Sequence, residues 1–327
     1  MSQVNLERLK AEVDLAANVF LSKWPAEADA GLYAPIHYLM SLGGKRLRAV
    51  LALSAAEAEG ERFEVALPAA LAVELFHNFT LMHDDIMDEA PLRRGQATVH
   101  HRWDRNAAIL SGDAMFTLSS IALTDLPAPS LPIALQMFNK TALEVCIGQQ
   151  ADMAFESRED VSLDEYWDMI RLKTSVLVAA SLAMGAQSAG APDDRVQLWY
   201  ELGEHLGLAF QMQDDLLDAF GTVATGKQVG GDILSDKKTF LRIHAWENAS
   251  DVQREEMEAW NGKNHNAASK VAAIKKVMVD LGSDVAARNR MEECVRSAEV
   301  CMDSLALSGE HRDWFQFVAG LVTTRMS

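Results

Sequence analysis

The chain lacks the features that mark secreted and membrane proteins. It has three cysteines in 327 residues, Cys146, Cys294 and Cys301, and they show neither metal-ligand spacing nor an even-numbered framework. We therefore expect reduced thiols, no disulfides and a cytoplasmic protein. No segment reaches the roughly 18 uninterrupted apolar residues typical of a membrane span, so we expect none.

Proline, glycine and positive charge are also scarce. The 8 prolines and 19 glycines are spread along the chain and no Pro/Gly/Ser-rich linker separates two halves, which predicts a single domain over residues 1–327. There are 30 Lys and Arg against 47 Asp and Glu, a formal charge of −17. That balance argues against a nucleic-acid-binding surface and makes the few local clusters of Lys and Arg candidate anion sites.

Alternating strand patterns are missing too, and the apolar period is helical nearly everywhere. Long helices are predicted over 66–89, 106–124, 130–157, 162–189 and 193–220, with others on either side, including 44–59 and 237–248. Helices of this length pack side by side into bundles that can hold a site in their core. The sequence predicts an all-α fold, a single large helical bundle with a deep central cavity.

A carboxylate motif occurs twice, each time behind a long apolar helical run. The two copies are Asp84-Asp85-Ile86-Met87-Asp88 and Asp214-Asp215-Leu216-Leu217-Asp218. Residues at i and i+4 share a helix face, so each copy sets like charges together at a cost of about 0.2–0.5 kcal/mol per pair. Solvated surface charge is the alternative, but apolar residues nearly encircle 71–83, which indicates burial. Cations should neutralise these groups, and oxygen ligands favour Mg²⁺, Mn²⁺ or Ca²⁺.

Basic residues gather near these motifs. Gly43-Gly44-Lys45-Arg46-Leu47-Arg48 begins a helix after a glycine pair, where backbone N–H groups and cations can converge on a phosphate; a solvated turn is the alternative. Arg93-Arg94-Gly95 follows the first motif, and adjacent guanidiniums can serve two diphosphates. Further cations are Lys173, Lys227, Lys237 and Lys238.

Together these segments resemble the trans-isoprenyl diphosphate synthases, or polyprenyl synthetases, over nearly the whole chain. Glu74-Leu75-Phe76-His77-Asn78 leads into the first aspartate motif, and Phe210-Gln211-Met212-Gln213 leads into the second. Gly44 to Arg48, Lys173-Thr174, Gly226-Lys227 and Lys237-Lys238-Thr239 fall in the family's order. The resemblance implies an isoprenoid synthase fold. It also implies a Mg²⁺-dependent head-to-tail condensation of isopentenyl diphosphate with an allylic diphosphate, giving a short-chain all-trans prenyl diphosphate.

The resemblance further implies a role for each matched residue. Asp84, Asp88 and Asp214 would hold about three Mg²⁺ ions, with Asp85, Asp215 and Asp218 behind them. The allylic diphosphate would be held by Arg93, Lys173, Lys227 and Lys237, with Lys238 able to replace Lys237. Isopentenyl diphosphate would be held by Lys45, Arg48, His77 and Arg94. Thr174 and Gln211 would stabilise the carbocation, and released diphosphate would take the final proton. A homodimer is the family habit, with helices near 106–124 and 130–157 as its interface.

Product length should depend on the residues below the first motif. Phe79 lies between one and two helical turns before Asp84, and Thr80 beside it is small. In the family a single aromatic at the deeper position accompanies a twenty-carbon product, and Phe76 would reinforce this floor. Geranylgeranyl diphosphate is therefore favoured over farnesyl diphosphate. The alternative is that both phenylalanines only pack in the core.

Three other functions would leave different traces. A terpene cyclase should carry an Asn-Asp, Ser and Glu triad in place of the second aspartate motif. A di-iron bundle is suggested by Glu74-x-x-His77, yet it needs a second Glu-x-x-His pair. A non-catalytic regulatory subunit should have lost an aspartate motif, and both copies are present here.

Overall fold

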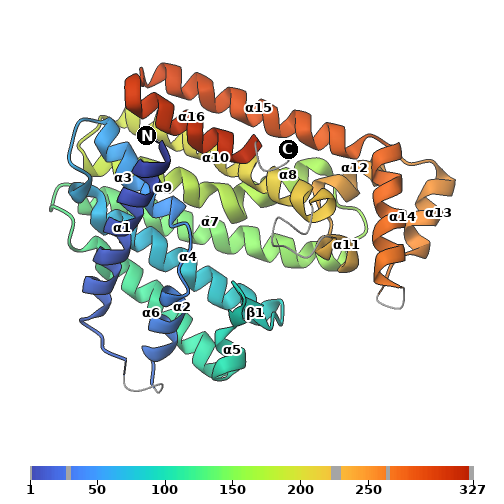
Figure 1. Cartoon of the computed structure of the whole chain (residues 1–327), viewed down its shortest axis with the longest axis horizontal. Coiled ribbons are helices and arrows are strands. Elements are labelled where there is room, and N and C mark those ends of the chain that lie inside the picture. Colours follow the sequence, from blue (N-terminus) through green and yellow to red (C-terminus); the bar gives the residue numbers. More distant parts are fainter. Residues whose placement is uncertain (1, 27–30, 222–229, 263–265, 324–327) are drawn as a thin grey trace. The chain divides into compact units, whose positions relative to one another are not determined.

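The chain is almost entirely helical, as predicted (Figure 1). The computed structural model describes residues 2–26, 31–221, 230–262 and 266–323. These form two compact units: the first is Met1–Ala142 with Ala180–Tyr200, and the second is Leu143–Ala179 with Glu201–Ser327. The boundaries fall inside long helices. The single domain expected from the sequence stays a prediction.

The first unit is built around α4. Its elements are α1 (Ser2–Leu21), α2 (Ala34–Ser41), α3 (Leu47–Ala58), the 3₁₀ turn η1 (Phe63–Ala66), α4 (Leu67–Met87), β1 (Leu92–Arg93), β2 (Gln96–Ala97), α5 (Val99–Arg102) and α6 (Arg105–Leu123), with parts of α7 (Leu131–Ser157), α9 (Val176–Ser188) and α10 (Asp193–Phe220). Pro68 lies in the first turn of α4, where its missing N–H costs nothing. α4 packs along α6 and α3, which explains why residues 69–76 are all buried.

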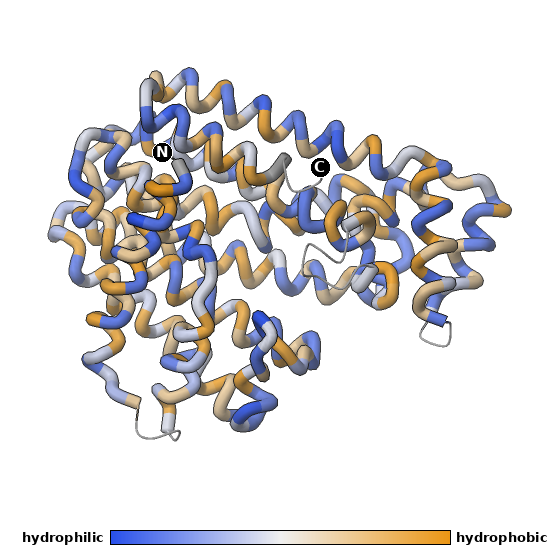
Figure 2. Tube along the Cα trace, viewed as in Figure 1, coloured by the Kyte–Doolittle hydropathy of each residue, from blue (hydrophilic) through white to orange (hydrophobic). Residues whose placement is uncertain are grey.

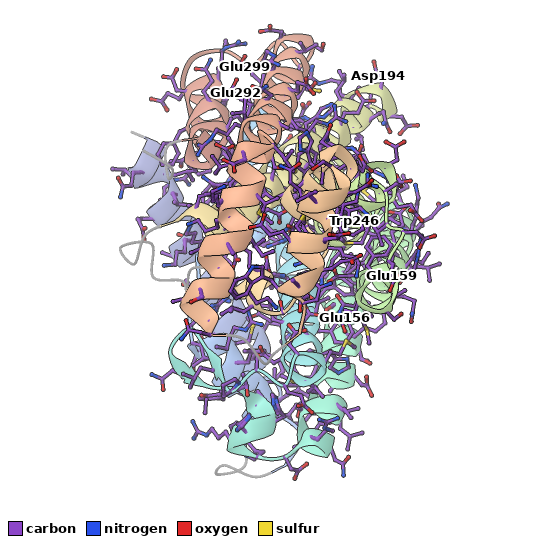
Figure 3. All side chains as sticks on the ribbon, turned by 90° about the vertical axis from the view of Figure 1, so that its right-hand side faces the viewer. Glu156, Glu159, Asp194, Trp246, Glu292 and Glu299 are labelled. Carbon is purple, nitrogen blue, oxygen red and sulfur yellow. The ribbon has the colours of Figure 1, made fainter. Side chains whose placement is uncertain are left out.

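The second unit contains the remaining helices. They are α8 (Leu163–Ile170), a π-helical segment (Arg171–Ser175), α11 (Gly231–Leu234), α12 (Phe240–Asn248), α13 (Asp251–Ala259), α14 (Ala267–Asp280), α15 (Ser283–Ser304) and α16 (Gly309–Thr323), with the rest of α7, α9 and α10. Met212, Ile274 and Met291 lie in its core. α15 alternates hydrophilic and hydrophobic residues along its length (Figure 2), and its exposed side carries Glu292 and Glu299 (Figure 3).

The structure adds local detail in three places that the sequence predictions did not specify. A small antiparallel hairpin pairs Leu92 with Ala97 and Arg93 with Gln96; such short strands carry no periodic signal. The helix predicted over 162–189 is interrupted by the π-helical segment, a register change that hydrophobic period does not reveal. The helices predicted at 44–59 and 237–248 begin at Leu47 and Phe240, so Lys45 and Lys237 lie in the preceding loops.

Three helical stretches, Phe63–Met87, Arg105–Leu123 and Leu163–Ser188, are long and apolar enough to cross a membrane by length and composition. Shares of 61%, 44% and 78% of their most apolar windows are buried inside the protein, so packing already accounts for much of this apolar surface. The absence of a membrane span stays a prediction.

All three cysteines are free, and burial raises the pKa of Cys294 and of Cys301 to about 11.

Candidate active site

The first aspartate motif occupies the C-terminal end of α4. Asp85 is buried and pairs with Arg93, whose Nη2 and Nε lie 2.6 and 3.0 Å from Asp85 Oδ1. Burial raises the pKa of Asp85, and Arg93 opposes that rise only in part. Asp84 is partly buried and Asp88, the C-cap residue, is exposed. The end of a helix carries partial negative charge, so this cluster of carboxylates is placed where cations are most favourable.

The second motif repeats this arrangement near the end of α10. Asp215 is 3% exposed, whereas Asp214 is exposed. The hydrogen-bond donors to Asp215 are neutral groups, the Tyr166 hydroxyl and Gln211 Nε2, the latter at 3.1 Å. Burial raises the pKa of Asp215 to about 7 despite these donors. In both motifs the middle carboxylate is buried, but its hydrogen-bond partners differ.

The turn of the β1–β2 hairpin separates the two adjacent arginines. Arg94 and Gly95 have φ of 54° and 76°, as a tight hairpin turn requires. Arg93 points to Asp85, while the Arg94 guanidinium lies against Gly44, where an added Cβ would be 2.9 Å from Nη2. One arginine therefore faces the first aspartate motif and the other faces the Gly43–Arg48 segment.

In the Gly43–Arg48 segment one cation, Arg46, is buried, and another, Lys45, is accessible to solvent. Arg46, 5% exposed, donates to Glu74 Oε1 at 2.8 Å, to Asp14 Oδ1 at 2.9 Å and to the Met40 carbonyl at 2.7 Å. Lys45 beside it is exposed. Arg46 therefore anchors the loop, which sequence reasoning missed because its partners are remote in the chain.

His77 lies close to Arg48 and Arg94 but is itself uncharged. Arg48 Nη1 lies 3.1 Å from His77 Nε2; a guanidinium can only donate, so this ring nitrogen accepts and the imidazole is neutral. Burial lowers the pKa of His77 well below 6.5, and the charges of Arg48 and Arg94 lower it further. A neutral imidazole here can still donate one hydrogen bond to a ligand through Nδ1.

In the second unit the π-helical segment presents Lys173 and Thr174. An added Cβ at Gly148 of α7 would be 2.3 Å from the Lys173 nitrogen, so only glycine permits this approach. Lys173 Nζ lies 2.5 Å from Asp152 Oδ2, and Lys237 Nζ lies 3.6 Å from the same atom. Burial would raise the pKa of Asp152, but Lys237 and Lys173 hold it below its ordinary value. Asp152, absent from the predicted site, brings two predicted lysines together.

A chain of hydrogen bonds links Thr174 to the second motif. Thr174 Oγ1 donates to Gln211 Oε1 at 3.0 Å, Gln211 Nε2 donates to Asp215 Oδ1 at 3.1 Å, and Tyr166 donates to Asp215 Oδ2. The predicted carbocation-stabilising pair is therefore in contact. Tyr166, fixed at the base of this chain, had no sequence signal because a buried tyrosine on an amphipathic helix reads as core.

Phe79 lies in an aromatic cluster below the first motif. Its ring stacks on Phe116 of α6 at 5.4 Å and meets Phe76 at 5.4 Å. Phe76 is fully buried and also contacts Phe116 and Phe138, while Thr80 bonds the His77 carbonyl at 2.8 Å. Phe79 and Phe116 thus form one aromatic surface, and Phe116 was missed because it lies on another helix.

The donor set fits magnesium in kind. Among the described residues, no three His, Cys, Asp or Glu side chains are grouped to hold a metal by themselves. Mg²⁺ is commonly held by one or two carboxylates together with water and substrate phosphates, which is what the aspartates of each motif can offer. Lys227 lies outside the described residues, and Lys238 has its pKa lowered by burial and by Arg242.

An all-α fold carrying two aspartate motifs, each with basic residues beside it, defines an isoprenoid synthase. The family model for polyprenyl synthetase matches residues 29–278, and the chain belongs to this family. It is 38% identical over 271 residues to a geranylgeranyl pyrophosphate synthase of Geoglobus acetivorans, covering 82% of this chain and 83% of the relative. A (2E,6E)-farnesyl diphosphate synthase of Mycobacterium tuberculosis is 46% identical over 197 residues, which is 60% and 55% of the two chains.

Solved structures agree with this membership. A crystal structure of a geranylgeranyl pyrophosphate synthase matches with a TM-score of 0.89 and 41% identity, covering 98% of each chain. A geranylgeranyl pyrophosphate synthase of Corynebacterium glutamicum, complexed with isoprenyl diphosphate and magnesium, matches with a TM-score of 0.86 and 27% identity over 98% of this chain and 99% of its own. The predicted family, the all-α fold and the short-chain trans-prenyltransferase class are confirmed.

Proposed function

We propose that this protein condenses isopentenyl diphosphate with allylic diphosphates and releases geranylgeranyl diphosphate. The observation that carries the proposal is the repeated arrangement in the two units: an aspartate motif near a helix end, with basic residues beside it. The sequence similarity to geranylgeranyl pyrophosphate synthases supports the same product.

The allylic diphosphate is bound by Arg93, Lys173, Lys227 and Lys237, and Asp84, Asp88 and Asp214 hold about three Mg²⁺ ions. When bound, these ions supply Lewis-acid stabilisation of the negative charge that develops on the leaving diphosphate. The approach of Lys173 and Lys237 to the same oxygen of Asp152 supports their joint role, because two cations held together around one carboxylate can turn to a doubly charged ligand.

Isopentenyl diphosphate is bound by Lys45, Arg48, His77 and Arg94. The contact of Arg94 with Gly44 and the bond between Arg48 and His77 support this grouping. The lowered pKa of His77 keeps the imidazole neutral among the arginines, so it binds by hydrogen bonding and leaves the charge to the guanidiniums.

Thr174 and Gln211 face the electron-deficient carbons of the ionised allylic substrate. The Thr174 hydroxyl donates its hydrogen bond to Gln211. The lone pairs of Thr174 Oγ1 therefore remain available to stabilise the carbocation. The protein supplies no base for the last proton, which passes to the released diphosphate.

Phe79, supported by Phe76 and Phe116, forms the floor that stops chain growth. Because Thr80 is small, it leaves room above Phe79 for a twenty-carbon product. We place this product in the central cavity of a single polyprenyl synthetase domain. Farnesyl diphosphate is the second candidate product, and the 46% identity to a farnesyl diphosphate synthase over part of the chain favours keeping it.

We also propose a homodimer in the cytoplasm without a membrane span. The support is apolar surface on two helices, where exposed side chains include Leu110 and Ile121 of α6 and Ile133, Leu143 and Ile147 of α7. Such runs of exposed apolar residues are typical of protein interfaces.

A product assay tests the proposal. Purified protein with Mg²⁺ and labelled isopentenyl diphosphate is given dimethylallyl, geranyl or farnesyl diphosphate, and the products are resolved by chain length after dephosphorylation. A twenty-carbon product from all three supports it. A fifteen-carbon stop would move the floor closer to Asp84, and no elongation would overturn the activity.

A further inference from the structure

The helix α11 connects the second aspartate motif to Lys237. Its 4 residues begin after Gly230, whose N–H donates to the Asp218 carbonyl at 2.6 Å. The Asp218 carboxylate accepts the Asp232 N–H at 2.9 Å. The start of α11 is therefore attached directly to the last residue of the motif.

The end of α11 determines where Lys237 leaves the helix. Lys237 N–H donates to the Asp232 carbonyl at 2.9 Å, and Asp236 N–H donates to the Ile233 carbonyl at 3.2 Å, the pattern of a Schellman cap. Asp236 has φ of 56°, a left-handed conformation in which glycine is usual because a Cβ is strained there. An aspartate at this position therefore needs other interactions to hold it.

A buried lysine from α14 supplies them. Lys270 has a side chain that is 2% exposed, and its Nζ lies 2.8 Å from Asp236 Oδ1. The same ammonium donates to the carbonyls of Leu234 at 3.2 Å and Gly262 at 3.0 Å. Lysine is almost never fully buried unless it is paired. Here it both neutralises Asp236 and caps a carbonyl that the last turn of α11 leaves open.

Two further contacts make this clamp rigid. Arg242 Nη1 lies 3.2 Å from Asp236 Oδ1, and the Gly262 N–H donates to Asp236 Oδ2 at 2.8 Å. Next to Lys270 along α14, Val271 packs on Gly230, where an added Cβ would be 2.7 Å from Val271 Cγ2. α14 thus contacts both ends of α11, beside which it lies (Figure 1).

We infer that Lys270 is a positioning residue for the allylic diphosphate: by capping α11 and pairing with Asp236 it fixes the direction in which Lys237 projects. The inference rests on the proposed role of Lys237 as a diphosphate ligand. Lys237 Nζ lies 3.6 Å from Asp152 Oδ2, whereas Lys270 contacts Leu234 and Asp236 just before Lys237 in the chain and acts through them without touching substrate.

The main test replaces Lys270 by methionine, an unbranched side chain one atom shorter that carries no charge. Lys270→Met should raise the KM for geranyl or farnesyl diphosphate about tenfold, because misplacing one charged ligand weakens a preorganised site. The KM for isopentenyl diphosphate should stay within about twofold, since Lys237 does not bind that substrate. Lys276→Met is the matched control, because Lys276 lies on the same helix, is 71% exposed and pairs with Asp280 one turn away.

A double-variant cycle separates positioning from general damage. If Lys270 acts through Lys237, Lys270→Met should change the allylic KM no further in a Lys237→Ala background. Equal increases in both KM values, or a full additional increase in that background, would overturn the inference.

Two outcomes distinguish this inference from the proposed function. Wild-type allylic KM in Lys237→Ala would overturn the role of Lys237 itself and the inference with it. An impaired Lys237→Ala with an unimpaired Lys270→Met would overturn only the role of Lys270. Should Lys270→Met not fold, Asp236→Asn replaces it, since asparagine also tolerates the left-handed conformation, keeps an oxygen for Lys270 and removes only the negative charge; a selective rise in allylic KM is again expected, and an unchanged value overturns the inference.

Discussion

The two aspartate motifs have the same sequence pattern but different surroundings. Asp85 faces the guanidinium of Arg93, whereas Asp215 faces the hydroxyl of Tyr166 and the amide of Gln211. Burial raises the pKa of both carboxylates, that of Asp215 to about 7. The first motif therefore holds its buried carboxylate with an ion pair and the second with neutral hydrogen-bond donors. In the second motif this hydrogen-bonded chain runs through Gln211 to Thr174, the residues proposed to face the carbocation.

The largest loss of activity is expected on removing the first carboxylate of either motif, Asp84 or Asp214, and the two losses should be equal. Asp84→Ala and Asp214→Ala should each lower kcat about a thousandfold or more, because each removes a ligand of ions that stabilise the leaving group. The measurement is turnover of labelled isopentenyl diphosphate at saturating Mg²⁺, with exposed Glu299→Ala as control. Near-normal turnover in either aspartate variant would contradict the metal role of that motif.

Removing the partner of the buried carboxylate should lower the free energy of unfolding more in the first motif than in the second. Arg93→Met leaves Asp85 buried without its cation and should cost about 2 kcal/mol, a value reduced because Arg93 is partly exposed. Tyr166→Phe removes one neutral hydrogen bond and should cost about 1 kcal/mol. Thermal unfolding of the metal-free, substrate-free proteins measures both, and a larger loss in Tyr166→Phe would reverse the comparison.

The helices below the motifs also differ, because Phe79 before Asp84 corresponds to Ala209 before Asp214. Only α4 therefore provides an aromatic floor at this position. Phe79→Ala should shift the products to chains longer than twenty carbons, with Phe116→Ala giving a smaller shift in the same direction. Chain-length analysis is the readout and Phe317→Ala of α16 the control; unchanged lengths in both variants would place the floor elsewhere.

The smallest effect concerns a titrating residue on the first-motif side, where His77 lies among arginines. Its pKa is lowered in the folded protein, so below pH 6.5 the unfolded chain binds a proton that the folded one does not. His77 therefore costs no stability above 6.5 and lowers it as pH falls below 6.5. His77→Gln should flatten the decline in Tm between pH 7.5 and 5.5, by a few degrees at most. Exposed His311→Gln should leave the profile unchanged; a profile unaltered by His77→Gln would contradict the assignment.

The fold class and the reaction class could be predicted from the amino-acid sequence alone. Apolar residues around α4 and α10 predicted buried helices, and the two aspartate motifs with their basic neighbours predicted a diphosphate and metal site. These properties are local: helical period and the spacing of charges within one turn are properties of consecutive residues. The order of the motifs was enough to identify the family.

Tertiary structure decided which partners these residues have. The anchoring of Arg46 by Glu74, the convergence of Lys173 and Lys237 on Asp152, and the burial of Lys270 under α11 all join residues remote in the chain. The same limit hid the π-helical segment, which lies close against Gly148 of α7, while the hairpin strands are too short to show a period. Packing and burial depend on residues brought together only by folding, and a spacing pattern carries no record of them.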